Sequence, residues 1–401
     1  MLYIQPKKEE LDICYNNDGI NRDNSSQKNY LNLIFEKPWG KEYLAYQNEK
    51  IGIWILHIDK GHETSLHCHF KKDTILVNIS GCFRINLFDE FKILNLFETI
   101  YVPKYTFHGI HSYCDNSVLM EIEIYSHKIN YTDKNDLLRL RDIYNRDKNS
   151  YENSVKERKP FDGEIFDFSK LYQTFNNTQI YINTINRIED LNIDKHDLIF
   201  LLEGELYQDG RLIDGTVLKK NMDISILSNE CKFICFSNIN YNYNNKIIYS
   251  KEHLQDIIKI YNFNNTGMTS GCFDIVHSGH LKNLKLGKKK CDKLFVCLSS
   301  DKQIKRLKGD DRPVNKLEDR INILVSMKFV DYVILYEEIN DDTEIELDNL
   351  MNIIKPSFWF KGSDYKKENI LKKHPSLNKV ELIELEEDKS TTNIINNIRK
   401  N

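Results

Sequence analysis

The segment "GCFDIVHSGH", from Gly271 to His280, joins a strand-like run to a lysine-rich, helix-like run. It places His277 and His280 three residues apart, and a helix that begins near Ser278 would hold His280 in its first turns. Backbone amides at a helix N-terminus favour anions, and phosphate is the commonest of them. The pair therefore indicates either a phosphate site or an ordinary helix start, and for an isolated HxxH pair the helix start is the better interpretation.

The residues around this segment alternate between strand-like and helix-like sequence patterns. Strand-like runs such as "DKLFVCLSS" and "DYVILY" are separated by helix-like runs such as "LEDRINILVSMKFV", from residue 266 to the end of the chain. Alternating strands and helices are typical of a parallel α/β sheet with helices on its faces. The sequence therefore predicts an α/β domain over residues 266–401, preceded by a helical connector over residues 251–265.

The first two thirds of the chain favour β structure. Residues 29–128 contain short β-branched or aromatic runs bounded by Gly, Pro, Asp and Asn, which predict a β-barrel or jelly roll. Residues 161–250 contain the same kind of short strand-like runs, which predict a second β domain. Residues 1–28 are expected to form a polar leader, and the charged residues 129–160 a helix with an exposed linker.

The bulk composition narrows the classes of protein. A chain of 401 residues with 40% hydrophobic residues is long enough for two or three globular domains. The net charge of −4 argues against general nucleic-acid binding, and no apolar run is long enough for a membrane span or a secretory signal. Nine cysteines without a framework spacing are expected to be reduced thiols in the cytoplasm.

Five motifs in residues 264–400 resemble one family. "GCFDIVHSGHLKNL" resembles the HxGH signature of the nucleotidylyltransferase superfamily, which includes the cytidylyltransferases. The order and spacing of "SSDKQIKRLKGDDRPVNKLEDR", "FVDYVILYEE", "IKPSFWFKGSDY" and "STTNII" are similar to those of the D-glycero-β-D-manno-heptose 1-phosphate adenylyltransferase domain. Glycerol-3-phosphate cytidylyltransferases are close relatives of that domain. The resemblance implies a Rossmann-like fold with the nucleotide at the carboxyl ends of the strands.

The resemblance also implies roles for individual residues. The catalytic set would be His277, His280, Lys305, Lys308 and Arg320, with the histidines on the triphosphate and the lysines in a basic loop near the β- and γ-phosphates. Asp274 would contact the acceptor or Mg²⁺. The other nucleotide-binding positions would be Gly271, Cys272, Phe273, Gly279, Lys361, Gly362, Asp364, Ser390, Thr391 and Thr392. Ser363 departs from the second glycine that is usual in heptose-type sequences, which leaves the base and the acceptor open.

A second histidine pair lies in "GHETSLHCHFKKDTILVNISG". His67 and His69 are two residues apart, so on a strand both project from the same face, and Asp73 and His108 follow. Imidazoles with one carboxylate inside a barrel would suit Zn²⁺, Mn²⁺, Fe²⁺ or Ni²⁺. In the "KPWG" context of residues 37–40, this order resembles the two cupin motifs of the phosphomannose-isomerase type, whose metal ligands would fall on His67, His69, Asp73 and His108. Asp73 departs from the usual glutamate. The second β domain would be a degenerate, metal-free cupin that packs or oligomerises.

These observations favour an enzyme. We expect transfer of a nucleoside monophosphate from ATP or CTP to a heptose-phosphate-like sugar phosphate, with release of pyrophosphate, for surface-glycan (capsule) synthesis. The cupin would supply an isomerase, epimerase or sugar-binding role. One alternative is a cytidylyltransferase that makes a CDP-polyol from glycerol phosphate or another polyol phosphate, and another is a sugar-sensing regulatory or scaffold protein with a vestigial transferase. A homo-oligomer without nucleic-acid or membrane partners is expected.

Overall fold

The computed structural model describes residues 1–17, 30–31, 33–125, 131–146, 155–160, 168, 170–175, 178–191, 193, 196–208, 211–213, 217–218, 224–238, 244–336, 343–362, 368 and 380–383. The chain divides into two compact units, Met1–Asn242 and Tyr243–Asn401. Among the described residues, none of the helices has the length and apolar character needed to cross a membrane. All nine cysteines are free thiols.

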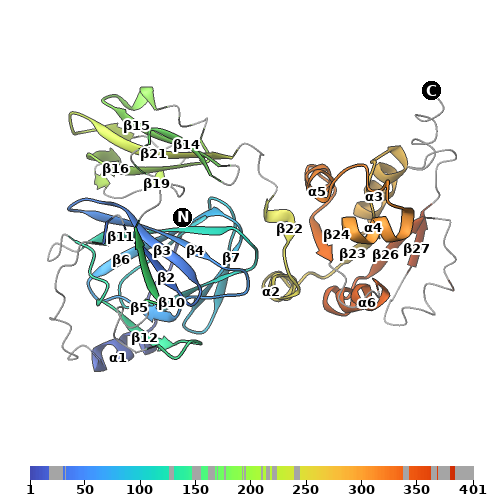
Figure 1. The fold of residues 1–401 in the computed structure, drawn as a ribbon, viewed down its shortest axis with the longest axis horizontal. Helices are drawn as coiled ribbons and strands as arrows, with labels where there is room; N and C mark the ends of the chain where they lie inside the picture. The colour runs from blue at the N-terminus through green and yellow to red at the C-terminus, as the bar shows by residue number, and fades with distance from the viewer. Residues whose placement is uncertain are drawn as a thin grey trace. The chain divides into compact units, whose positions relative to one another are not determined.

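The first unit is built on a two-sheet β-barrel (Figure 1). The larger sheet has the strand order β1 (Leu2–Tyr3), β9 (Thr99–Val102), β6 (Lys72–Ser80), β11 (Ser117–Tyr125), β4 (Ile51–Ile58), β3 (Gly40–Gln47), β2 (Leu33–Lys37) and β13 (Glu157–Pro160). The smaller sheet has the order β12 (Leu138–Arg141), β5 (Leu66–Cys68), β10 (His108–Ser112), β7 (Phe83–Leu87) and β8 (Phe91–Leu94). This architecture confirms the predicted β-barrel, and strands from outside residues 29–128 (β1, β12 and β13) also belong to its sheets.

Alternation along the strands of the larger sheet gives it two apolar faces. Trp54, Leu76 and Leu119 pack inside the barrel with Phe83 of the smaller sheet. Ile53, Ile75 and Met120, which belong to the same strands, project from the opposite face and pack in a separate cluster. Since side chains alternate along a strand, each position on β4, β6 and β11 can be assigned to one of the two faces.

The second β block covers the outer face of the larger sheet. Its first sheet has the order β14 (Tyr172–Phe175), β15 (Thr178–Ile185), β21 (Cys231–Asn238), β16 (Leu198–Glu203) and β19 (Val217–Leu218). Its second sheet has the order β18 (Arg211–Ile213), β17 (Leu206–Gln208) and β20 (Ile224–Ile226). A short 3-10 turn lies at Ile188–Asp190. Ile182, Phe200 and Phe236 pack in the same cluster as Ile53 and Met120. The block therefore buries apolar surface that the barrel alone would expose to water.

Two segments expected to lie outside the barrel belong to it. The described part of the leader forms β1 and helix α1 (Lys8–Asn16), where Glu10 accepts a hydrogen bond from the Phe107 N–H at 2.7 Å. The described residues of the charged segment form β12 and β13 instead of a helix. Leu137 and Leu138 are buried there, and the Asp136 carboxylate accepts backbone N–H groups of residues 70 and 71. These few buried residues hold the segment on the barrel, although most of its residues are charged or polar.

The second unit confirms the parallel α/β sheet. Its strand order is β22 (Ile247–Ile248), β25 (Tyr332–Tyr336), β24 (Lys293–Ser299), β23 (Thr266–Gly271), β26 (Phe358–Gly362) and β27 (Val380–Ile383), and every described pairing is parallel. The helices are α2 (Lys251–Tyr261), α3 (Ser278–Lys290), α4 (Asp301–Lys308), α5 (Leu317–Val325) and α6 (Thr343–Ile354), with a 3-10 turn at Asn244–Lys246 (Figure 1). The expected connector is therefore part of this unit, as helix α2.

The strand order reverses at β23. The chain moves outward from β23 to β24 and β25, and then returns to place β26 on the other side of β23. In doubly wound sheets, ligands bind beside the carboxyl ends of the strands at such a switch point. The segment from Gly271 to His280 begins at the carboxyl end of β23, so the fold places it at this position.

Candidate functional site

His277 and His280 lie together at the N-terminus of helix α3. His277 is the N-cap residue and His280 is the third residue of the helix, with their ring centroids 3.9 Å apart. The preceding turn holds Phe273 at a φ of 46°, in the left-handed region, and its ring lies 5.1 Å from that of His280. A bulky residue rarely adopts this conformation outside functional or strained sites. The helix start, the two imidazoles and the strained turn together form an anion-binding geometry.

The hydrogen bond to His280 defines its tautomer. The backbone N–H of His277 donates to His280 Nδ1 at 3.4 Å, so the proton of a neutral ring lies on Nε2. Burial, with a smaller contribution from His277, lowers the pKa of His280 to about 4. Near pH 7 the ring is therefore neutral and retains one N–H donor that this contact does not use.

Asp274 is held in place by hydrogen bonds from a neighbouring loop. Its carboxylate is buried, and Oδ1 accepts the N–H groups of Val314 and Asn315 at 2.8 and 2.9 Å. Oδ2 accepts from Arg312 Nε at 2.6 Å. Both oxygens already accept hydrogen bonds within the protein, and the contact of Asp274 with the acceptor or Mg²⁺ stays a prediction. Asp274 positions the loop at residues 312–315 beside the β23 turn.

Arg320 is also a positioning residue in this structure. Its side chain is fully buried, and its guanidinium donates to the carbonyls of Cys272 (2.7 Å), Ser299 (2.8 Å) and Asn315 (3.1 Å) and to Asp301 Oδ1 (2.6 Å). These contacts join the ends of β23 and β24 to the start of α4. These contacts give Arg320 a positioning role in the structure, and its catalytic role stays a prediction.

The remaining described positions lie around the same turn. Gly271 ends β23, Cys272 is partly exposed, and Gly279 lies in the first turn of α3. Lys361 and Gly362 end β26, where Lys361 Nζ donates to Ser270 Oγ at 2.7 Å and lies 4.7 Å above the Trp359 ring. The parallel pairing of β23 with β26 brings these residues together.

Lys305 and Lys308 are not in a loop. Both are exposed in the last turn of α4. Asp364, Ser390, Thr391 and Thr392 lie outside the described residues, and their assigned roles stay predictions.

The second histidine pair forms a compact cluster with His108. The ring nitrogens of His67, His69 and His108 that could bind a metal ion all lie within 4.8 Å of one another. β5 carries His67 directly opposite His108 of β10, and His69 follows at the end of β5. The barrel therefore brings together three of the four predicted ligands.

Backbone carbonyls orient each ring of the cluster. The Nδ1 atoms of His67, His69 and His108 lie 2.8, 2.5 and 3.2 Å from the carbonyl oxygens of residues 65, 136 and 106. Each Nδ1 therefore carries the proton, which leaves the Nε2 lone pairs for the centre of the cluster. The buried Nε2 atoms of His69 and His108 have no hydrogen-bond partner among the described residues. Unsatisfied lone pairs supported by outer hydrogen bonds are the arrangement that a metal ion requires.

Asp73 does not complete this ligand set. It projects from the outer face of β6 with Ile75 and Val77, and its carboxylate accepts from Tyr101 Oη (2.6 Å) and the Lys104 N–H (2.8 Å). The motif spacing predicted a ligand here, but Asp73 has the wrong parity on the strand. The neighbouring inward position is Lys72, whose buried ammonium pairs with the buried Glu123 carboxylate.

The cluster borders a pocket of about 60 Å³ whose charged lining the sequence did not reveal. Its charged walls are Lys37, Lys134, Arg139, Arg146, Glu42 and Glu121. The inward parity of residue 121 on β11 was readable from the strand pattern. The positions of Arg139 and Arg146 were not, because they depend on the charged segment folding back onto the barrel.

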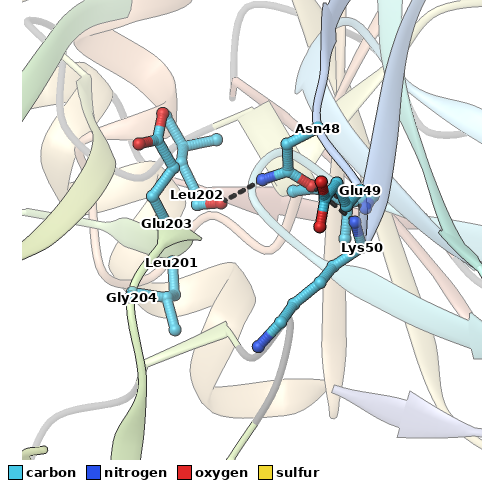
Figure 2. Close-up of a pocket in the computed structure, with 8 residues that line it drawn as sticks. Asn48, Glu49, Lys50, Leu201, Leu202, Glu203 and Gly204 are labelled. Atoms are coloured by element: carbon cyan, nitrogen blue, oxygen red, sulfur yellow. Dashed lines mark hydrogen bonds between the residues drawn. The ribbon is translucent and has the colours of Figure 1, made fainter. Parts of the chain in front are cut away.

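A second cavity, of about 230 Å³, lies between the barrel and the second β block (Figure 2). The turn at residues 48–50 faces the end of β16, and Asn48 Nδ2 donates to the Leu202 carbonyl at 3.0 Å. Glu203 is held by Tyr46 Oη at 2.6 Å and Lys232 Nζ at 3.1 Å. These contacts join the two blocks, and the described lining contains neither histidine nor cysteine.

Comparisons with known proteins agree with both halves of this description. Residues 268–397 match the family described as cytidylyltransferase-like, and residues 23–142 match the family described as mannose-6-phosphate isomerase C-terminal. The second unit contains a cytidylyltransferase-like domain. The barrel is a cupin domain of the second family, and its match extends to residue 142, in agreement with the strand found at β12.

Two relatives share the name bifunctional protein HldE. The one from Campylobacter fetus is 44% identical over 131 residues, which cover 33% of this chain and 27% of that protein. The one from Campylobacter jejuni serotype O:6 is 39% identical over 185 residues, which cover 46% of this chain and 37% of that protein. The chain therefore spans little more than a third of these relatives at most. A lipopolysaccharide core biosynthesis protein from Thermoplasma volcanium is 27% identical, with a TM-score of 0.26, over 30% of this chain and 96% of its own.

Replacing His69 by alanine is expected to weaken Zn²⁺ binding by about a hundredfold or more, because one of three converging imidazoles is lost. Asp73→Asn is the control, since Asp73 faces away from the cluster, and its Zn²⁺ affinity should equal that of the wild type. Isothermal titration of the full chain measures both. Equal losses in the two variants would contradict the three-histidine ligand set.

The same rings predict how the stability of the metal-free barrel depends on pH. Burial lowers the pKa of His108 from 6.5 to about 4, and burial also lowers the pKa values of His67 and His69. The unfolded chain therefore binds more protons than the folded chain between these values. The free energy of unfolding should have its full value above pH 6.5. Below pH 6.5 it should fall by roughly 1.4 kcal/mol per pH unit for each such histidine, because the unfolded state takes up the protons. Urea titrations at pH 7.5, 6 and 5 measure it, and a value independent of pH would contradict the buried neutral rings.

Proposed function

We propose that the second unit transfers a nucleoside monophosphate from ATP or CTP to the phosphate of a sugar phosphate, with release of pyrophosphate. The observation that carries the proposal is the neutral His280, held with its Nε2–H available at the helix start beside the β23 switch point. The cytidylyltransferase-like match over residues 268–397 supports this reaction class.

The reaction needs no nucleophile from the protein. A phosphate oxygen of the acceptor attacks the α-phosphorus, a new P–O bond forms, and the bond between the α-phosphorus and the bridging oxygen breaks. The leaving pyrophosphate retains that electron pair. Mg²⁺ that enters with the triphosphate offsets part of its charge. The His280 Nε2–H and the free amides of α3 donate to the phosphate oxygens, and Lys361 adds positive charge at the end of β26.

A second candidate acceptor is a polyol phosphate, with CTP as the donor. The family description as cytidylyltransferase-like favours CTP, whereas the HldE relatives and the resemblance to heptose-type domains favour ATP and a heptose phosphate. A vestigial transferase in a regulatory protein is less favoured, because the histidines and the turn retain a geometry suited to phosphate.

A pyrophosphate-release screen distinguishes these alternatives. The full chain is incubated with Mg²⁺ and each of ATP, CTP, GTP and UTP, in combination with sugar phosphates and polyol phosphates. We expect release with one of the first two nucleotides and a sugar phosphate, most strongly with a heptose phosphate. No release with any pair from folded protein would contradict the transferase function.

For the cupin we propose a bound divalent transition metal, Zn²⁺, Mn²⁺, Fe²⁺ or Ni²⁺, and an isomerase, epimerase or sugar-binding role on the same route. The three-histidine cluster supports the metal, which would supply Lewis acidity when bound. We also propose a cytoplasmic location, where nucleoside triphosphates are available and the nine free thiols stay reduced. A homo-oligomer stays a prediction.

A further inference from the structure

Two cysteines of the first unit lie in contact where helix α1 packs on the barrel. Cys14 belongs to α1 and Cys68 to strand β5, and their Sγ atoms are 3.5 Å apart although the residues are 54 positions apart in the chain. Both side chains are fully buried. A disulfide has an S–S distance of about 2.05 Å, so the two sulfur atoms would have to approach by only about 1.5 Å to form one.

The side chain of Cys68 points away from the three-histidine cluster. Leu66 and Cys68 pack in one apolar cluster with Cys14, whereas His67, which lies between them on β5, lines the pocket inside the barrel. Neighbouring side chains of a strand project from opposite faces. A bond between Cys68 and Cys14 therefore involves neither the histidine rings nor a metal ion bound by them.

Few buried side chains attach helix α1 to the barrel. The helix has nine residues, of which Glu10 and Cys14 are buried. Glu10 accepts the hydrogen bond from the Phe107 N–H. A helix of this length is marginally stable without its tertiary contacts, and elements with few buried contacts open locally at a small free energy. Local opening of α1 would therefore give a small oxidant access to both thiols.

We propose that Cys14 and Cys68 are a redox modification site, at which hydrogen peroxide converts the two thiols into a reversible disulfide. The thiolate of one cysteine attacks a peroxide oxygen, the O–O bond breaks, and a sulfenic acid and one water result after protonation. The thiolate of the other cysteine attacks that sulfur. The S–S bond then forms, the S–O bond breaks, and a second water leaves. Two thiols are oxidised, one peroxide is reduced to two waters, and a small thiol in excess reverses the bond.

The disulfide fastens helix α1 to strand β5. With both thiols reduced, as in this structure, α1 can open from the barrel and close again. With the bond formed, residue 14 stays attached to residue 68, and Glu10 is kept close to the Phe107 N–H. Oxidation therefore changes how often α1 opens. The proposal depends neither on the nucleotide chemistry of the second unit nor on metal binding by the cupin.

The test treats the folded full chain with hydrogen peroxide, alkylates the remaining thiols and identifies cross-linked peptides by mass spectrometry. Wild type is compared with Cys14→Ser and Cys235→Ser. Cys235 is the matched control, because it is equally buried in the first unit while its Sγ accepts from Asn183 Nδ2 at 3.6 Å. Amide hydrogen exchange of residues 8–16, before and after oxidation, measures the opening of α1.

We expect the peptide that joins Cys14 to Cys68 in wild type and in Cys235→Ser, its absence in Cys14→Ser, and its loss after dithiothreitol. Exchange in α1 should become about tenfold slower in the oxidised wild type, because the bond restricts opening. Folded wild-type protein that does not form this cross-link would overturn the proposal. So would Cys14 or Cys68 found mainly as sulfinic acid or mainly bonded to other cysteines. Exchange in α1 that the bond leaves unchanged would overturn the fastening of the helix.

Discussion

Replacing His280 by alanine is expected to slow pyrophosphate release by roughly two to three orders of magnitude, because one preorganised donor to the reacting phosphates is lost. The neutral ring of His280, with its proton on Nε2, supplies that donor without a change of protonation near pH 7. Steady-state release of pyrophosphate with the preferred nucleotide and acceptor measures the effect.

Two further variants separate a lost donor from a damaged helix. Lys289→Ala, near the other end of α3, should retain the wild-type rate, since this exposed residue is remote from the helix start. His280→Gln keeps a neutral N–H donor and should recover part of the lost rate. An alanine variant that folds normally and turns over at more than half the wild-type rate would refute the role of His280.

Replacing Arg320 by methionine is expected to destabilise the second unit by about 3 kcal/mol, because several buried acceptors lose their donor at once. Arg320 is fully buried, whereas its carboxylate partner Asp301 is 40% exposed, so we expect the lower end of the range for a broken buried pair. Calorimetry of the full chain should show the transition of this unit at a temperature lower by roughly 6–12 °C.

Arg306→Met provides the comparison, because Arg306 is exposed on α4 and its loss should change stability by less than about 0.5 kcal/mol. The same pair of variants distinguishes a positioning role from a catalytic one. A large loss of turnover by Arg320→Met with unchanged thermal unfolding would show that the guanidinium acts on substrate, contrary to its enclosed position.

Local patterns were sufficient to predict the second unit. Alternating strands and helices indicated the parallel sheet, and the HxGH segment was placed correctly at the carboxyl end of β23. Side-chain partners could not be predicted. Asp274 and Arg320 are directed into the protein by contacts with residues about 40 positions away along the chain. Motif spacing places a residue at a site, but it does not predict which neighbouring groups form hydrogen bonds or ion pairs with its side chain.

The cupin shows the same division. The spacing of His67 and His69 predicted a shared face, and the pairing of β5 with β10 brought His108 to them. Asp73 was wrongly predicted to be a metal ligand. Its spacing from the histidines was plausible, but its position on β6 directs the side chain to the outer face of the barrel. The charged segment at residues 129–160 was expected to form a helix with an exposed linker, since a few buried residues among many charges are a weak signal. Those residues nevertheless complete the barrel and provide Asp136, whose carbonyl orients His69.

Transfer of the α-phosphoryl group is the central claim, and an isotope experiment tests it most directly. The full chain is incubated with Mg²⁺, a heptose phosphate or the acceptor found by the screen, and ATP or CTP labelled at the α-phosphorus. The reaction proposed here predicts that the label enters a nucleotide sugar and that one pyrophosphate is released for each label transferred. Label that remains in the triphosphate, or that appears only as free nucleoside monophosphate, would contradict it.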